Sequence, residues 1–289
     1  GGDFIPPPAK RRRFFSQEWA DNEGYSQNHG LIAKVELSSA WTLQAGLFQS
    51  RFVADHDFSE LLVNVDQNGV GERLVIARRD QRFASTSGEV RLSYRFIEGP
   101  RKHTVHAALL GRDSSARSGG ASVVSLGPGL ISVGDQEPVP TFTFGPLNHD
   151  TVRQGTFGVA YQGLWPGVGE FSAGLQRSDY RKVNVQQVPV PARSVRRDKP
   201  WLWNATGALY ITNDFAVYGG YTRGLEESGN APADAANRFE VLPAIRTSQR
   251  EVGARLALTD DVKLVTGIFD VRKPYFALDN AQVDRKSVV

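Results

Sequence analysis

Two histidines three positions apart, His103 and His106, are the first candidates for metal chemistry in this sequence. Apolar and polar residues alternate around them, which predicts an extended strand. Side chains three apart in a strand point to opposite faces and cannot hold one ion without a bulge, so we interpret both as polar surface residues. Asp55, His56 and Asp57 are adjacent but have no further ligand in view, and we expect no metal site.

Motifs for covalent catalysis are absent from the sequence. It contains neither a Gly-x-Ser-x-Gly segment nor a phosphate-binding loop, and its many glycines are not followed by a helical pattern. It also has no cysteine, which excludes a disulfide framework, thiolate metal sites and cysteine nucleophiles. We therefore predict no catalytic residue, no cofactor and no enzymatic activity.

Arginine provides the remaining chemistry. Lys10–Arg13, together with Arg193, Arg196 and Arg197, falls in candidate outer loops, where guanidinium groups could bind anionic ligands or lipopolysaccharide phosphates. The alternative for each is ordinary solvated loop charge. No single residue is identified as ligand-binding.

A second set of arginines falls within strands. Arg91, Arg95 and Arg255 alternate with apolar neighbours and are expected to face a wet lumen. A lumen lined with arginine favours anionic solutes.

The elements that would position these side chains are hairpins. Between Thr247 and Arg272, apolar residues alternate along two arms joined by Thr259-Asp260-Asp261. Pairing Leu258 with Val262 places every apolar residue of both arms on one face. Val265 and Phe269 are exceptions, because they fall on the face that should be polar. The same hairpin pattern, with matched apolar faces, recurs around Thr212–Asp214 and Ser38–Ala40.

Twelve strands are predicted along the chain, and helical periodicity is nowhere sustained. They lie at 29–37, 41–50, 59–66, 72–79, 86–97, 102–111, 152–163, 169–181, 201–211, 215–224, 247–258 and 262–272. Short connections at 38–40, 98–101, 164–168, 212–214 and 259–261 alternate with long ones at 112–151, 182–200 and 225–246.

This alternation predicts an antiparallel up-and-down barrel that crosses a membrane. In a meander, successive connections lie at opposite ends of the sheet, and outer-membrane barrels have short periplasmic turns and long extracellular loops. No apolar stretch of about eighteen residues is present, which excludes a transmembrane helix. The apolar face of each hairpin would then face lipid.

Aromatic residues gather where two interfacial girdles are expected. Those near the short turns are Trp41, Tyr94, Phe96, Trp165, Tyr210 and Phe215, and those near the long loops are Trp201, Trp203 and Tyr221. The general preference of aromatic residues for strands is the alternative explanation.

Other architectures fit less well. A propeller should repeat every 40 to 50 residues, but the short turns recur unevenly. A soluble sandwich would have shorter strands and an even scatter of loop lengths. The net charge of +3 gives no general nucleic-acid footprint. The chain starts at Gly1 without a methionine, and a strand pattern breaks off at Val289, so we expect residues 1–289 to be a partial barrel domain truncated at both ends.

Several segments resemble the later barrel of TonB-dependent outer-membrane receptors. They are Tyr221–Ser228, Leu242–Thr247, Gln249–Gly253 and Phe269–Phe276. In that family a strand ending in a Tyr-x-x-Gly-like segment enters a long loop, and a stretch like that from Pro243 to Gly253 begins the next strand. The resemblance is strongest over Trp201–Phe276.

The resemblance implies part of a barrel of twenty-two strands, with the plug domain and the TonB box absent from this chain. It further implies uptake of a ferric siderophore or similar iron chelate across the outer membrane of a Gram-negative bacterium. The implied partners are outer-membrane lipid, lipopolysaccharide and the TonB complex, reached through the missing plug. A passive porin-like channel and a soluble or surface β protein for adhesion or carbohydrate binding are the alternatives.

Overall fold

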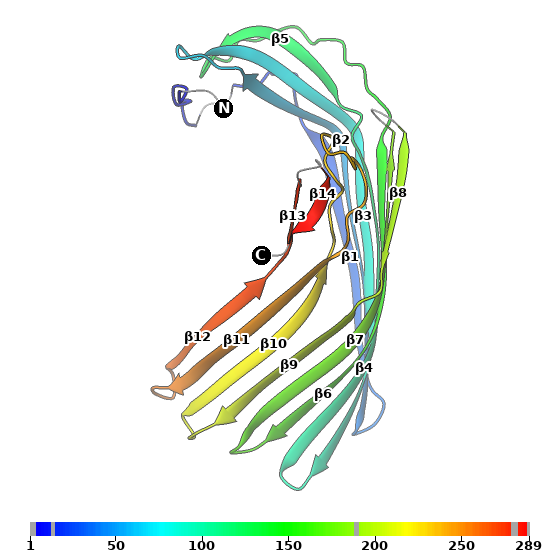
Figure 1. Cartoon of the computed structure of the whole chain (residues 1–289), viewed down its shortest axis with the longest axis vertical. Helices are drawn as coiled ribbons and strands as arrows, with labels where there is room; N and C mark the ends of the chain where they lie inside the picture. The colour runs from blue at the N-terminus through cyan, green and yellow to red at the C-terminus, as the bar shows by residue number, and fades with distance from the viewer. Residues whose placement is uncertain (1–3, 13–14, 188–190, 279–282, 288–289) are drawn as a thin grey trace.

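The chain forms one curved antiparallel sheet, in which β6 to β12 lie side by side (Figure 1). The computed structural model describes residues 4–12, 15–187, 191–278 and 283–287. Ten strands follow one another as neighbours in the order β1-β2-β3-β4-β6-β7-β9-β10-β11-β12, with β5 beside β3 and β8 beside β7. A separate hairpin, β13 and β14, lies on the concave side of the sheet (Figure 1).

The strand bounds are as follows. They are β1 Glu23–Glu36, β2 Trp41–Val63, β3 Val70–Glu98, β4 Arg101–Ser118, β5 Ser122–Leu130, β6 Asn148–Trp165, β7 Gly169–Gln186, β8 Ala192–Asp198, β9 Trp201–Tyr210, β10 Phe215–Glu226, β11 Ile245–Ala257, β12 Lys263–Arg272, β13 Tyr275–Leu278 and β14 Asp284–Ser287. No helix in the described ranges is long and apolar enough to cross a membrane.

The three predicted hairpins have the predicted register. Leu256 pairs with Leu264 and Ala254 with Thr266, and corresponding pairs form in the other two hairpins. Each short turn contains a hydroxyl group that accepts hydrogen bonds from backbone amides within the turn: Thr259 Oγ1 from Val262, Thr212 Oγ1 from Phe215 and Ser38 Oγ from Trp41. A serine or threonine at the start of the turn therefore closes each hairpin.

The strands near the amino terminus are longer than the sequence pattern predicts. The expected strands at 41–50 and 59–66 are one strand, β2, and those at 72–79 and 86–97 are one strand, β3. The pattern failed because charged residues fall on both faces between Arg51 and Asp57, where alternation is lost. Backbone pairing requires no apolar face, so the ladder continues beyond the apolar zone.

Two of the predicted long loops also contain strand. The expected connection at 112–151 holds the end of β4 and all of β5, and the one at 182–200 holds β8. Opposite Leu74–Ala77, β5 continues the register of β4 before it shifts by one residue at Arg73, and β8 keeps the register of β9 throughout. β4 with β5 and β8 with β9 are therefore each one interrupted strand. The buried Gln81 side chain spans the first interruption, accepting from Gly119 N and donating to Gly119 O.

The convex face of the sheet is apolar and exposed. Leu31, Leu47 and Leu109 are 72%, 58% and 61% exposed, and the ladder places Leu109 between Val90 and Phe157. An apolar surface of this extent marks a contact with a membrane or with another protein. Val265 and Phe269 pair with Arg255 and Glu251 and thus lie on the concave face, as the sequence predicts.

Aromatic side chains border this apolar band at both ends. Trp41 packs on Tyr94 with ring centroids 4.7 Å apart near the short turns, and Trp203 stacks on Tyr221 at 4.3 Å near the long loops. The ladder places Tyr210 on the concave face, opposite Ala216, so it does not belong to the girdle.

His103 is not the polar surface residue that the sequence suggests. It points to the convex face, is 8% exposed, and stacks on Phe96 while its Nδ1 lies 2.7 Å from the Tyr161 hydroxyl. His106 is on the opposite face beside Ser93, which confirms that the two histidines do not converge.

The apolar convex face gives a test of which side faces lipid. We expect Leu109→Arg to lower the free energy of unfolding in phospholipid vesicles by roughly 2 to 4 kcal/mol, the cost of an arginine on the lipid face of a barrel. Leu110→Arg, the adjacent position on the concave face, is the matched control and should cost much less. Equal losses in urea titrations of the two variants would contradict this assignment.

Candidate functional site

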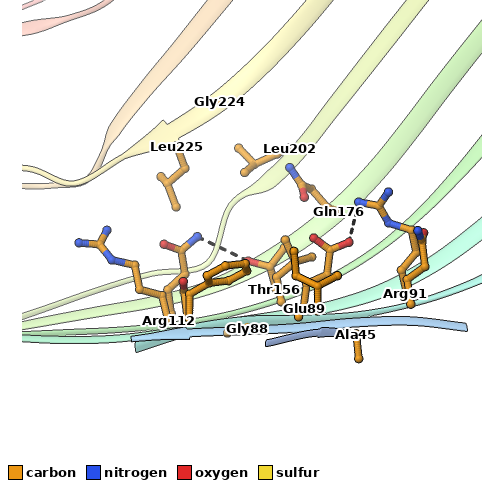
Figure 2. A pocket seen from close by; sticks show the side chains of 18 residues that line it. Ala45, Gly88, Glu89, Arg91, Arg112, Thr156, Gln176, Leu202, Gly224 and Leu225 are labelled. Carbon is orange, nitrogen blue, oxygen red and sulfur yellow. Dashed lines mark hydrogen bonds and ion pairs between the residues drawn. The ribbon is translucent and has the colours of Figure 1, made fainter. Parts of the chain in front are cut away.

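The concave face holds a hollow of about 740 Å³ midway along the sheet (Figure 2). Its polar lining comes from five neighbouring strands, and three leucines close its sides. The polar residues are Gln44, Ser87, Glu89, Arg91, Arg112, Gln154, Thr156 and Gln176, and the leucines are Leu110, Leu202 and Leu225. Such a mixture of amides, hydroxyls and charges suits a polar solute or a polar protein surface.

Charges in and near the hollow are paired. Arg91 lies 2.5 Å from Glu89, and Arg255, farther along the concave face, lies 3.3 Å from Glu170. Arg91, Arg95 and Arg255 all lie on the concave face, as predicted, and carboxylates offset much of the charge of Arg91 and Arg255. Selection of anionic solutes by Arg91 and Arg255 is therefore weaker than the sequence suggests.

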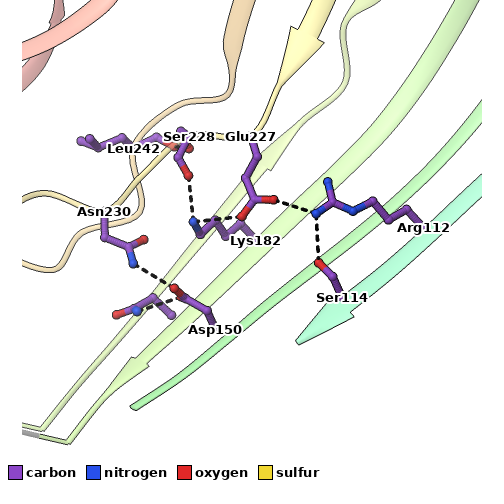
Figure 3. Close-up of polar contacts among 9 residues, drawn as sticks. Arg112, Ser114, Asp150, Lys182, Glu227, Ser228, Asn230 and Leu242 are labelled. Carbon is purple, nitrogen blue, oxygen red and sulfur yellow. Dashed lines mark hydrogen bonds and ion pairs between the residues drawn. The ribbon is translucent and has the colours of Figure 1, made fainter. Parts of the chain in front are cut away.

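Next to the hollow, charged residues gather beneath the loop that joins β10 to β11 (Figure 3). Glu227 lies 3.2 Å from Arg112 Nη2 and 3.3 Å from Lys182 Nζ. Lys182 Nζ also donates to Ser228 O at 2.8 Å, and its side chain is only 5% exposed. A buried ammonium needs such partners, because its desolvation would otherwise be costly.

The same loop is fastened along its length to the concave face. Asn230 Nδ2 donates to Asp150 at 3.2 Å, and the backbone amides of Val241 and Ala244 donate to Ser194 and Asp198. Ala231, Ala235 and Leu242 form a small apolar cluster inside the loop. The loop 227–244 is therefore a folded unit seated on the inner wall.

Tyr180 lies under this loop, beyond the level of the Trp201 girdle. It is 1% exposed and packs with Val152 and Ala244. Burial, reinforced by the nearby Glu227 carboxylate, raises the pKa of Tyr180 to about 12. The phenol thus remains neutral at physiological pH and serves the packing of the loop.

A second group of residues covers the sheet where β2 ends and β3 begins. The buried Gln17 side chain donates from Nε2 to Asp135 O and accepts at Oε1 from Glu137 N. The backbone amide of Gln17 donates to the Glu60 carboxylate. Trp19 packs on Phe58 with ring centroids 5.8 Å apart. The segment before β1 and the loop before β6 therefore form one ordered cap on the sheet.

The basic clusters predicted from sequence lie apart from one another. The Lys10 amide donates to Ser132 Oγ in the cap, and Arg13 lies outside the described residues. Arg193 and Arg197 are on the convex side of β8, whereas Arg196 is on the concave side, 3.4 Å from Asp198. Among the described residues there is no cluster of three or more potential metal ligands.

Sequence reasoning missed the residues under the loop. Arg112, Asp150, Lys182 and Glu227 all fall in segments that the sequence presents as long connections. Arg112, Asp150 and Lys182 lie within two positions of the ends of the strands predicted at 102–111, 152–163 and 169–181, which was the available signal, whereas Glu227 lies in the loop and had none.

Comparisons with known proteins give a family and a fold. The family described as "TonB dependent receptor-like, beta-barrel" matches residues 2–273. No curated protein sequence matches the chain.

Among solved structures, the ferric preacinetobactin receptor BauA from Acinetobacter baumannii is similar, with a TM-score of 0.72 and 18% identity, covering 98% of this chain and 43% of that one. The ferric-catecholate import receptor Fiu from E. coli has a TM-score of 0.73 and 12% identity, covering 95% of this chain and 44% of that one. The pyoverdine-bound FpvA from P. aeruginosa has a TM-score of 0.72 and 12% identity, covering 94% of this chain and 37% of that one. The chain thus spans less than half the length of these receptors.

The Lys182 contacts predict how firmly the loop is held. In Lys182→Met, we expect amide hydrogen exchange of Ala231, Phe239 and Leu242 to accelerate more than tenfold, because charge-assisted hydrogen bonds of roughly 1.5 to 3 kcal/mol are lost. Lys34→Met removes an exposed lysine of β1 and should leave these rates unchanged. Unaltered exchange in Lys182→Met would mean that the apolar cluster and the hydrogen bonds to Asp150, Ser194 and Asp198 hold the loop without Lys182.

Proposed function

We propose that this chain, which belongs to the TonB-dependent receptor-like β-barrel family, is the barrel wall of an outer-membrane receptor that imports a ferric siderophore or similar iron chelate. The family match over residues 2–273 carries the proposal, because it applies to nearly the whole wall. The similar structures named above as receptors for ferric preacinetobactin and for ferric catecholates support the choice of cargo.

The faces of the wall are suited to this role. The apolar convex face with its aromatic borders would lie in the outer membrane, and the polar concave face would line the passage. The hollow beside Arg91 and Arg112 offers amides, hydroxyls and guanidinium groups to a polar solute or to a plug. The seated loop 227–244 narrows the passage on the long-loop side, where cargo would enter.

The need for an energy source distinguishes the proposed receptor from a passive porin-like channel. A passive channel would require no energy source, whereas a TonB-dependent receptor passes its cargo only when the inner membrane is energised. The family membership favours the energised route.

The decisive measurement is uptake of radioactive iron by a strain deleted for the encoding gene. Across a panel of ferric siderophores, we expect uptake of at least one chelate to fall to background and to return with the wild-type gene. The restored uptake should stop when TonB is removed. In the restored strain, Arg112→Gln should reduce uptake several-fold because it removes one of the two cations that hold Glu227, while Arg101→Gln at a short turn should not.

Two outcomes would contradict the proposal. Unchanged uptake of every chelate in the deletion strain would remove iron chelates as the cargo. Restored uptake that persists without TonB, together with steady conductance in a planar bilayer, would establish a passive channel instead.

A further inference from the structure

The loop 227–244 is folded within itself. The Ala231 amide donates to Glu240 O at 2.8 Å, and the Phe239 amide donates to Ala231 O at 2.9 Å. Leu242, a member of the apolar cluster inside the loop, donates from its amide to Gly229 O. All these contacts join residues of the loop to one another, so the loop would keep its shape if it left the wall.

The two ends of the loop are held to the wall in different ways. At the carboxyl end, Ala244 packs against the buried Val152 and Tyr180, and this contact is apolar. At the amino end the contacts are polar, because Glu227 lies between two cations and Asn230 donates to a carboxylate of the wall. Polar contacts can be exchanged for contacts with a solute or with water, so the amino end is the one that can be released.

The seated position of the loop leaves polar atoms without partners. In the described part of the chain, the amide oxygens of Asn184 and Asn230 are buried and accept no hydrogen bond. The amide nitrogens of both residues donate to Asp150, at 2.8 and 3.2 Å. A buried oxygen without a donor costs free energy, and water would reach these oxygens if the amino end lifted. The ion pairs of Glu227 have to offset this cost.

Glu227 occupies a site that is built for an anion (Figure 3). One of its carboxylate oxygens lies 3.2 Å from Arg112 Nη2, and the other lies 3.3 Å from Lys182 Nζ. The Lys182 side chain is only 5% exposed, and Ser114 Oγ lies 3.4 Å from the same Arg112 nitrogen. A guanidinium and a buried ammonium that face one carboxylate would bind the carboxylate of a solute in the same way.

One of these two cations is open to the passage. Arg112 is 42% exposed, and it lines both the hollow of about 740 Å³ and a smaller one of about 300 Å³ that also reaches Glu227. A solute in either hollow therefore meets Arg112 before the loop moves. Arg91, the other arginine of the larger hollow, is different, because its partner Glu89 lies on the same strand and exchange there would move no loop.

We propose that the loop 227–244 is a self-inhibitory latch, in which Glu227 occupies the place of a solute carboxylate. A solute with several carboxylates would take Arg112 from Glu227, and the amino end of the loop would lift while Ala244 remains packed on the wall. Binding and lifting are then linked, since whatever favours the lifted loop also favours the solute. The proposal rests on the proposed function only in taking the solute to be the iron chelate in the cell.

The test measures the position of the loop rather than transport. The chain contains no cysteine, so spin labels can be attached to the receptor at Asp234→Cys in the loop and at Arg101→Cys in a short turn. Distances between the labels are measured by pulsed electron paramagnetic resonance in detergent, with and without millimolar propane-1,2,3-tricarboxylate. We expect one population of distances without the tricarboxylate and a second, distinct one with it. Glycerol with sodium chloride at matched ionic strength should not produce the second population.

Substitutions then locate the latch. Glu227→Gln keeps the shape of the side chain and removes its charge, so it should raise the ratio of lifted to seated loop roughly tenfold without any solute. Glu170→Gln is the matched control, because it breaks a comparable pair with Arg255 on the concave face near the short turns, away from the loop. The control should leave the ratio unchanged.

Three results would overturn the proposal. The same distances in Glu227→Gln and in the wild type would show that this carboxylate does not hold the loop. A wild type that does not respond to the tricarboxylate, beside a lifted loop in Glu227→Gln, would show that Arg112 is closed to exchange. An equal response to glycerol with sodium chloride would make the effect one of charge screening. The distances require no iron uptake, so failure of the uptake assay and failure of the latch are separate results.

Discussion

The whole structure depends on the unbroken pairing of backbone amides from one strand to the next. A strand in hydrocarbon has no water to satisfy its N–H and C=O groups, so each must pair with a neighbour. From β4 through β7 the register does not slip, and even the interrupted partners of β3 and β7 resume the register they left. Constant register keeps each side chain on its own face, and this separates an apolar convex face from a polar concave one.

How much of this could be predicted from sequence depends on how strongly each face is apolar. Where one face meets hydrocarbon, as in the hairpin around Thr259, alternation is clean and the register could be predicted pair by pair. Where polar and apolar residues no longer alternate, as from Arg51 to Asp57 and through β8, backbone pairing persists without a hydrophobic pattern, and the sequence predicted connections instead. Twelve predicted strands thus correspond to ten in the path of the sheet.

The candidate site was less predictable for a different reason. The alternation of side chains along a strand was enough to place Arg91 and Arg255 on the concave face. It could not show that Glu89 and Glu170 pair with them and weaken their attraction for anions. The group around Lys182 joins strands to a loop 45 positions away, as the hydrogen bond between Lys182 and Glu227 shows. Strand periodicity contains no information about such a contact, because it depends on how a loop returns over the sheet.

The interruption between β8 and β9 shows how little a paired strand loses when one donor is missing. Pro200 has no amide hydrogen and cannot donate to β7, but its carbonyl accepts from Ser178 N at 3.2 Å. Asp198 and Trp201, on either side of the break, face Tyr180 and Arg177 in one register, with no residue gained or lost between them. A proline in the wall therefore removes one hydrogen bond and leaves every neighbouring side chain on its own face.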